Sequence, residues 1–542
     1  MTRSGTLIVR GRVLVRADAG ELRTADAVAV RDGRVVAVGS RAEVEAAAPG
    51  ASRALDFGDR VVIPGIHDFH LHLVGLARAR AGVDLDAAPD PTAFLDRLRH
   101  AARTAQPGAW VTGRGWSEAQ LATAGLDRMA DAVAHGAAFL SSHDGHSAWA
   151  SPAALEAAGI RRETPDPAGG RIERDAHGAP TGVLRETAID LVVARVPKLQ
   201  GQALRPHLDA VLRELAALGI TGASEAGDYT DEGGIGDDAA LGDSFSTLTD
   251  LRDLVDGRLR LSIGIPVDAL PAAAGRGMTT GAPLAGARTL RFGWAKEYAD
   301  GALGSGTAAL FEPRTCGEAG TGILRVERDE LDALFERARG ARIGLAIHAI
   351  GDRAVATVLD AAARARPRAA GVPLDRMEHV QLSRTEDRPR LARLMTASMQ
   401  PIHAAADRDL VEACWDGRQD DAYAWRSIAT AGARLAFGSD APVESANPWL
   451  GVHAAVHRRL PTDQRGDWRP GQALTVAEAL AAYTLGPARA LGMEGEGHLA
   501  PGARADLAVL NVDLATLLAA DDRLGGVRSL LTLVDGEVVH EG

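Results

Sequence analysis

The chain has 542 residues, with 60 Lys and Arg residues against 72 Asp and Glu residues, which gives a formal net charge of −12. This acidic balance excludes a nucleic-acid partner, because phosphate binding requires a basic stripe. Two cysteines, Cys316 and Cys414, are too few for a disulfide framework, so we expect inert thiols in a reducing compartment, the cytoplasm. The only lysines are Lys198 and Lys296, and each either persists by chance or sits where a primary amine is needed.

Short β-like runs separated by turns occupy both ends of the chain. The first stretch holds a hairpin signal at Asp32-Gly33, and the last stretch holds a matching one at Asp535-Gly536. Arginines interrupt the first apolar run, so we expect neither a signal peptide nor a membrane span. We predict a small β-sandwich domain built from residues 1–63 and 499–542, with residues 64–498 inserted into it.

Apolar runs that end in polar residues recur through the middle of the chain, separated by helical stretches rich in Ala, Leu and Arg. These runs are 61–72, 219–227, 258–267, 289–300, 341–352, 375–382, 395–400 and 433–440. Eight βα units predict an α/β fold, the TIM (β/α)8 barrel, whose chemistry lies where each strand ends.

Two segments interrupt this rhythm. Residues 83–210 follow the first strand and contain their own apolar runs, so we predict a folded insertion subdomain rather than a loop. The Gly- and Asp-rich segment 227–247 is either a solvated loop or an active-site lid, and the sequence does not decide between them.

Candidate metal ligands lie at the ends of the predicted barrel strands. His70 and His72 close the first strand, and because alternate residues of a strand point the same way, both imidazoles can face one ion. Later strands end, in chain order, in Lys296, His348, His379 and Asp440. Imidazole and carboxylate suit Zn²⁺ and similar ions, and a catalytic site keeps one position open for water. The ordered set therefore predicts a catalytic metal site at the mouth of the barrel.

With these motifs the chain resembles the amidohydrolase superfamily in its binuclear-metal form, and within it the branch called amidohydrolase family 3. Further matching stretches are GRGWSE, SSHDGHSAWAS, KEYADGALGSGTA, AIHAIGDRAV, MEHVQL, FGSDAPVESANPWLG and LAPGARADLAVL. The resemblance implies that the six strand-end residues are metal ligands and that CO₂ carboxylates Lys296, which then bridges two ions. The implied cofactor is Zn²⁺, one or two ions per chain, although other divalent ions are possible.

The resemblance also implies a reaction. We expect an amidohydrolase that cleaves a non-peptide C–N bond, an amide or formamide in a small molecule, by metal-activated hydroxide with Asp440 as general base. Alternatives on the same metal site are cyclic amide, imide or ester hydrolysis, deamination and non-hydrolytic isomerisation. A non-catalytic ligand-binding barrel is the alternative from another class. Family members often self-associate, so we expect a homodimer.

Six further residues are candidates for substrate contacts: Trp116, Asp144, His146, Trp294, Asp300 and His403. His146 is also a catalytic candidate, because it could hydrogen-bond the substrate carbonyl or the oxyanion, although a histidine satisfied within the insertion is equally consistent. Asp300 either steadies the site through hydrogen bonds or contacts the substrate. The two tryptophans are pocket walls or core residues.

Overall fold

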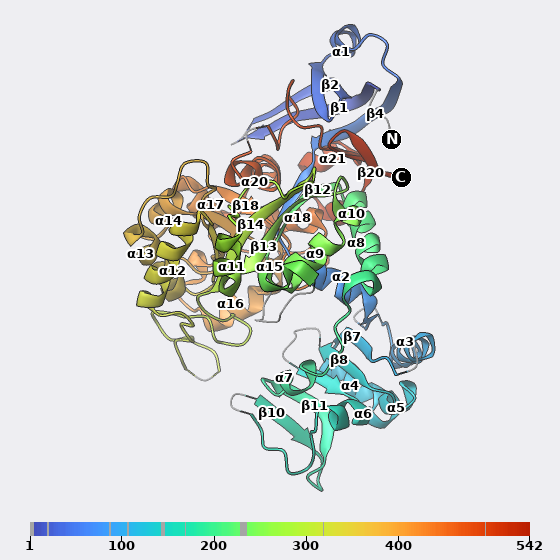
Figure 1. Cartoon of the computed structure of the whole chain (residues 1–542), viewed down its shortest axis with the longest axis vertical. Helices are drawn as coiled ribbons and strands as arrows, with labels where there is room; N and C mark the ends of the chain where they lie inside the picture. The colour runs from blue at the N-terminus through green and yellow to red at the C-terminus, as the bar shows by residue number, and fades with distance from the viewer. Residues whose placement is uncertain are drawn as a thin grey trace. The chain divides into compact units, whose positions relative to one another are not determined.

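The structure is a computed structural model that describes residues 5–18, 21–85, 88–105, 108–142, 147–167, 170–227, 236–317, 319–493 and 495–542 (Figure 1). The chain divides into two compact units. One combines Met1–Val74 with Asp209–Gly542, and the other is Gly75–Leu208.

The first unit contains a parallel sheet that has eight strands among the described residues. In spatial order these are β5 (Ile66–Leu71), β12 (Ile220–Glu225), β13 (Arg260–Pro266), β14 (Leu290–Tyr298), β15 (Leu345–Ala349), β16 (Arg376–His379), β17 (Thr396–Met399) and β18 (Leu435–Phe437). Each strand lies inside one of the predicted runs, and most of their residues are buried, as expected for a sheet covered on both faces. The predicted α/β barrel is confirmed.

The last strand meets the first through residues just beyond β18. The Asp440 amide donates to the His70 carbonyl at 2.7 Å, and the Ser439 amide donates to the Asp68 carboxylate at 2.9 Å. Gly438 permits this approach, because a Cβ there would lie 2.3 Å from the His70 nitrogen. The barrel is therefore closed at the point where two of the predicted ligands lie.

Helices cover the barrel with apolar stripes. Helix α12 (Arg328–Ala341) buries Leu331, Leu334, Phe335 and Ala338, and α13 (Asp352–Arg364) buries Val355, Val358, Leu359 and Ala362. Both sets follow the three-and-four spacing that places side chains on one face of a helix. The described helices include none that is long and apolar enough to cross a membrane.

Strands from both chain ends form one sheet, with seven strands among the described residues. Its spatial order is β21 (Glu537–Glu541), β20 (Ser529–Val534), β19 (Leu507–Asp513), β4 (Arg53–Pro64), β1 (Leu7–Asp18), β2 (Glu21–Arg31) and β3 (Arg34–Gly39). Figure 1 shows the blue N-terminal strands beside the red C-terminal ones. Asp32-Gly33 and Asp535-Gly536 form the two hairpin turns, with positive φ at all four residues.

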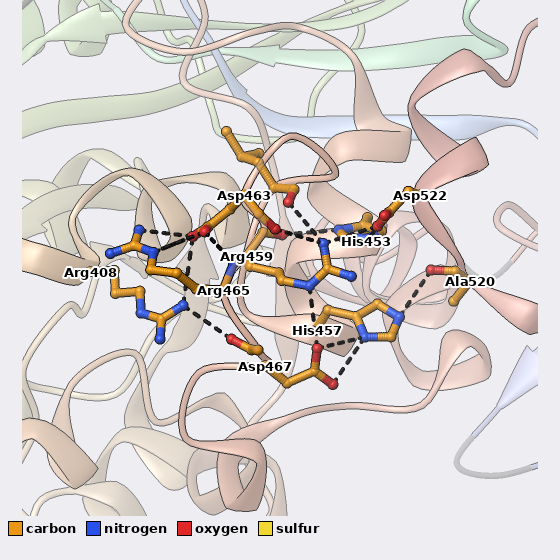
Figure 2. Close-up of polar contacts among 11 residues, drawn as sticks. Arg408, His453, His457, Arg459, Asp463, Arg465, Asp467, Ala520 and Asp522 are labelled. Carbon is orange, nitrogen blue, oxygen red and sulfur yellow. Dashed lines mark hydrogen bonds and ion pairs between the residues drawn. The ribbon is translucent and has the colours of Figure 1, made fainter.

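Helix α18 (Pro448–His457) is tied to the C-terminal segment by a polar network (Figure 2). The His453 ring lies 2.9 Å from the Arg459 carbonyl and 3.1 Å from the Asp522 carboxylate. His457 contacts both oxygens of Asp467 at 3.1 Å, and its ring centroid lies 4.7 Å from that of His453. The network connects the barrel to η6 (Asp522–Gly526).

The second unit is built on a mixed sheet, with six strands among the described residues. Their order is β10 (Gly170–Arg174), β11 (Pro180–Glu186), β9 (Ser147–Ala150), β8 (Ala138–Ser142), β7 (Val111–Trp116) and β6 (Val83–Asp84). Helix α3 (Pro91–Thr104) buries Phe94, Leu95 and Leu98 in the apolar core of this unit.

The expectation of two inert thiols is wrong. Cys316 and Cys414 are joined by a disulfide, with their Cα atoms 4.5 Å apart. The two residues are 98 positions apart in the chain, so their proximity depends on the barrel topology and has no local signal. The pairing also removes the argument from free cysteines for a reducing compartment.

Candidate metal centre

Three buried side chains converge at the C-terminal mouth of the barrel. His70 Nε2 lies 3.3 Å and His72 Nε2 lies 3.2 Å from Asp440 Oδ1. Within the described part of the chain, His70 Nε2 and Asp440 Oδ1 make no hydrogen bond. Buried polar atoms are normally hydrogen-bonded. Buried imidazole and carboxylate atoms that lack this partner and lie close together fit the donor set of a metal ion.

The other nitrogen of each imidazole is held by a fixed partner. His70 Nδ1 lies 2.5 Å from Glu378 Oε2, and His72 Nδ1 lies 3.2 Å from the Gly227 carbonyl oxygen. Such partners fix the ring orientation and tautomer of a histidine that binds metal through its second nitrogen. Burial would raise the pKa of Glu378, but Arg376 and His70 hold it well below the ordinary value. The ionised carboxylate thus directs His70 Nε2 toward Asp440.

His348 and His379 extend the cluster. Their ring centroids lie 4.6 Å apart, and that of His379 is 5.0 Å from that of His70. His379 Nδ1 contacts Gln400 Oε1 at 2.8 Å, and His348 Nε2 contacts the Gly301 carbonyl at 2.9 Å, while His348 Nδ1 makes no hydrogen bond within the described residues. Burial lowers the pKa of His348 to about 3 and that of His379 well below its ordinary value, so both imidazoles are neutral, the form that binds metals.

Lys296 lies on β14 between these groups, with 3 % of its surface exposed. Burial lowers the pKa of Lys296 to about 8, although Glu378 and Asp440 act in the opposite direction. About a tenth of the amine is therefore unprotonated at pH 7, far more than for an ordinary lysine. The Nζ atom lies 4.9 Å from the centre of the Tyr298 ring.

Two of the candidate ligands adopt left-handed backbone conformations. The φ angle is 73° at His379 and 61° at Asp440. A side chain with a Cβ rarely adopts this region, which costs about 1–3 kcal/mol, although Asp and His enter it more readily than most residues. At Asp440 the hydrogen bond that closes the barrel holds the conformation in place.

His403 joins the cluster from α15 (Pro401–Ala406), directly after β17. Its Nε2 lies 3.1 Å from Asp440 Oδ2, so the two oxygens of Asp440 have different partners. Burial would lower the pKa of His403, but the hydrogen bond and charge of Asp440 raise it to about 9. His403, predicted to contact substrate, therefore touches the candidate ligand Asp440, a contact that the sequence did not predict.

Asp300 makes the contacts of a residue that steadies the site, whereas its contact with substrate stays a prediction. Its side chain is fully buried and accepts hydrogen bonds from the amides of Ala309, Ile350 and Gly351 at 2.8–3.0 Å. Burial raises the pKa of Asp300 to about 7 despite these bonds. Its role is to hold together the loops after β14 and β15, which is the other interpretation of the sequence.

The two predicted tryptophans are core residues, not pocket walls. Trp116 is fully buried in the second unit, and its indole donates to the Leu140 carbonyl at 2.7 Å. Trp294 lies inside the barrel, where its ring centroid is 5.7 Å from that of Phe69 and its indole donates to the Leu374 carbonyl at 2.9 Å. Both rings satisfy their single donor internally, so neither presents a polar edge to a ligand.

Other predictions lie outside the described residues. Asp144 and His146, together with His143, lie outside the described residues, and so do residues 228–235 of the Gly- and Asp-rich segment. The described part of the Gly- and Asp-rich segment resumes with η2 (Gly236–Leu241).

Sequence reasoning missed Glu378 and Gln400, whose side chains contact His70 and His379, and Arg376, which pairs with Glu378. Arg376 and Glu378 form a buried ion pair on β16, and the Arg376 guanidinium lies 4.0 Å from the Phe69 ring centre. Two opposite charges at alternate positions of a buried strand are a detectable signal, because such charges are rarely buried without partners.

A parallel barrel that gathers His, Lys and Asp side chains from separate strand ends has the architecture of a metal-dependent hydrolase. The model of the amidohydrolase family matches residues 53–540, and the chain belongs to this family. A model of an imidazolonepropionase-like composite domain from bacteria matches residues 27–51.

Similar proteins share nearly the whole length of the chain. A putative amidohydrolase, YtcJ, of Bacillus subtilis is 31% identical, covering 95% of this chain and 96% of its own. An N-substituted formamide deformylase of Arthrobacter pascens is 29% identical, covering 95% of each chain. An uncharacterized metal-dependent hydrolase of Pyrococcus horikoshii has a TM-score of 0.75 at 24% identity, over 94% of this chain and 98% of its own, which shows a shared fold.

Proposed function

We propose that the protein hydrolyses a non-peptide C–N bond, an amide or formamide, in a small-molecule substrate. The observation that carries the proposal is the convergence of His70, His72 and Asp440, with His348 and Lys296, on one buried mouth of the barrel. The similarity to an N-substituted formamide deformylase over 95% of both chains supports this class of bond.

We further propose that the site holds one or two Zn²⁺ ions. His70, His72 and Asp440 would hold one. His348 and His379, whose ring centroids lie 4.6 Å apart, would hold a second, because neutral imidazoles and a carboxylate are the donors that zinc prefers. When bound, the ions would supply a Lewis acid for the substrate carbonyl and lower the pKa of a water molecule.

Lys296 is proposed to become an N-carboxylate, whose oxygens would add to the donors that hold the metal. An unprotonated amine adds to CO₂, forms an N–C bond and releases one proton, which gives a carbamate with two oxygens. The buried environment favours the unprotonated amine that this step needs. An arginine could not replace Lys296, because the guanidinium keeps its proton.

Asp440 moves the proton in the proposed reaction. Burial would raise the pKa of Asp440, but the charge of His70 and the hydrogen bond from His403 hold it well below the ordinary value, so the carboxylate is ionised and Oδ1 can accept a proton from water. His403 contacts Oδ2 and thereby leaves Oδ1 directed into the mouth. The same oxygen can then pass the proton to the leaving nitrogen.

The test uses the two lysines as a matched pair. Lys296→Arg should abolish turnover and lower the metal content measured by elemental analysis, while Lys198→Arg, at an exposed lysine of the second unit, should leave both unchanged. Because the chain has only two lysines, ¹³CO₂ labelling with NMR should show a carbamate signal that Lys296→Arg removes.

The substrate panel should contain formamides, N-acyl amines, cyclic imides and esters. Turnover of formamides or acyl amines is the expected result. Turnover of esters alone would contradict the proposed bond class, and retained turnover in Lys296→Arg would contradict the carbamate.

A further inference from the structure

The disulfide Cys316–Cys414 joins two segments on the catalytic face of the barrel. Cys316 lies in the loop that follows β14, here residues 299–317 and called the β14 loop, and Cys414 ends α16 (Arg408–Cys414). Cys414 is 4 % exposed, whereas Cys316 is partly exposed. Cys316 is therefore the residue of the pair that is closer to solvent, and Cys414 is shielded.

The β14 loop begins at the metal centre. Its Gly301 carbonyl contacts His348, and Asp300 binds the amides of Ile350 and Gly351. At its other end the loop rests on α16, where the Thr315 amide donates to the Cys414 carbonyl at 2.9 Å and Thr315 Oγ1 donates to the Ala413 carbonyl at 2.8 Å.

The second joined segment also begins at the metal centre. Helix α16 follows α15, which carries His403, and His403 contacts Asp440 at 3.1 Å. The disulfide thus joins the β14 loop to α16, and both segments follow candidate catalytic groups in the chain. The hydrogen bonds of Thr315 also join the β14 loop to α16. Thr315 is exposed, however, and hydrogen bonds of exposed residues add little net stability in water.

We propose that Cys316–Cys414 is a reversible thiol-exchange site whose reduction releases the β14 loop from α16. Release loosens the Gly301 carbonyl that fixes His348 and the helix that presents His403. The effect on turnover rests on the proposed function, whereas the effect on the loop does not. The partner is a dithiol reductant, either a small molecule or a redox protein, that approaches the exposed side.

The exchange is balanced as follows. A thiolate of the dithiol attacks Cys316 Sγ, the S–S bond breaks, and Cys414 leaves as a thiolate that takes up a proton. The second thiol of the reagent then attacks the mixed disulfide, so that the reagent leaves as a cyclic disulfide and Cys316 gains a proton. Two electrons pass from the dithiol to the two cysteines.

The experiment compares three forms of the full chain: oxidised, reduced with dithiothreitol and capped with iodoacetamide, and the Cys316→Ser/Cys414→Ser variant. After desalting, trypsin cleavage after Arg314, in the β14 loop, is followed by mass spectrometry. We expect cleavage about tenfold faster in the reduced form and in the variant, since local opening becomes easier. Dithiothreitol should not change cleavage of the variant.

Turnover and metal content are measured on the same three forms, with the substrate found in the panel. We expect the reduced form and the variant to lose both relative to the oxidised form. Two free thiols in the air-exposed protein, or equal cleavage after Arg314 in all forms, would overturn the proposal. Faster cleavage with unchanged turnover would overturn the link to the metal centre, and turnover absent in every form would instead contradict the proposed function.

Discussion

Asp300 gives the sharpest test of how the metal centre is supported. Its Oδ1 accepts from the Ile350 amide at 3.0 Å, and its Oδ2 accepts from the amides of Gly351 and Ala309 at 2.8 and 2.9 Å. Asp300→Ala leaves three buried donors without their acceptor, and each such donor costs about 1–3 kcal/mol. Partial access of water reduces the sum, so we expect a local loss of about 3–6 kcal/mol.

Asp300→Asn keeps the shape but not the number of acceptors. An amide oxygen can accept from two donors at most, and the amide NH₂ then faces the third donor. We expect a smaller loss, of about 1–3 kcal/mol. We therefore expect both substitutions to lower local stability, and Asp300→Ala to lower it more than Asp300→Asn.

Hydrogen exchange measured by mass spectrometry suits this prediction, because the loss is local. Peptides that contain Ala309 or Ile350-Gly351 should exchange about a hundredfold faster, or more, in Asp300→Ala. Asp332→Asn is the control, since Asp332 forms a half-exposed ion pair with Arg364 on the barrel helices and should change exchange little. Unchanged exchange in Asp300→Ala, or equal effects of the alanine and asparagine variants, would refute the reasoning.

Three further predictions follow from named contacts. Glu378→Gln removes the charge that orients His70, so zinc affinity measured by competition with a chelator should fall about 10–100-fold, and unchanged affinity would contradict this role. The pKa of Glu478 is lowered to about 2 by its bonds with Arg426 and Thr475, although burial opposes this. Its stabilising effect is therefore complete above the unfolded value of 4.5 and lost as the pH falls toward 2. Glu478→Gln should lower stability by about 1 kcal/mol at pH 7 and by nothing near pH 2, as thermal melting at both pH values will show. Trp294→Ala should lower the free energy of unfolding by about 3–5 kcal/mol, because it leaves a cavity. Trp294→Phe should retain turnover. A loss of turnover in a stably folded Trp294→Phe variant would instead support the pocket-wall role.

The barrel strands were predictable because their signal is local. Parallel strands covered on both faces need continuous apolar runs, and catalytic groups must follow them at the open end, so each run and its polar terminus occur together in the sequence. The run 341–352 thus contains β15 and His348, and the run 375–382 contains β16 and His379.

The missed features depend on contacts between distant residues. Nothing near Cys316 indicates that α16 will pass beside it, and nothing near Trp294 indicates that its indole will meet the Leu374 carbonyl. The role of Asp300 was ambiguous for the same reason, since two of the amides that donate to its carboxylate belong to the loop after β15. The identity of a polar residue at a strand end is thus predictable, but which atoms will satisfy it is not.

The scarcity of lysine has different explanations at its two positions. Lys198 is exposed, where an arginine would be hydrated equally well, so its survival needs no structural reason. Burial lowers the pKa of Lys296, and the buried guanidinium of Arg376 adds to this effect. Burial also lowers the pKa of His348, and the charge of Lys296 lowers it further. An arginine at 296 would bring a second permanent charge into this space, whereas a lysine can lose its proton there. Burial beside the charge of Arg376 therefore disfavours a second arginine at this position, independently of any bias in codon use.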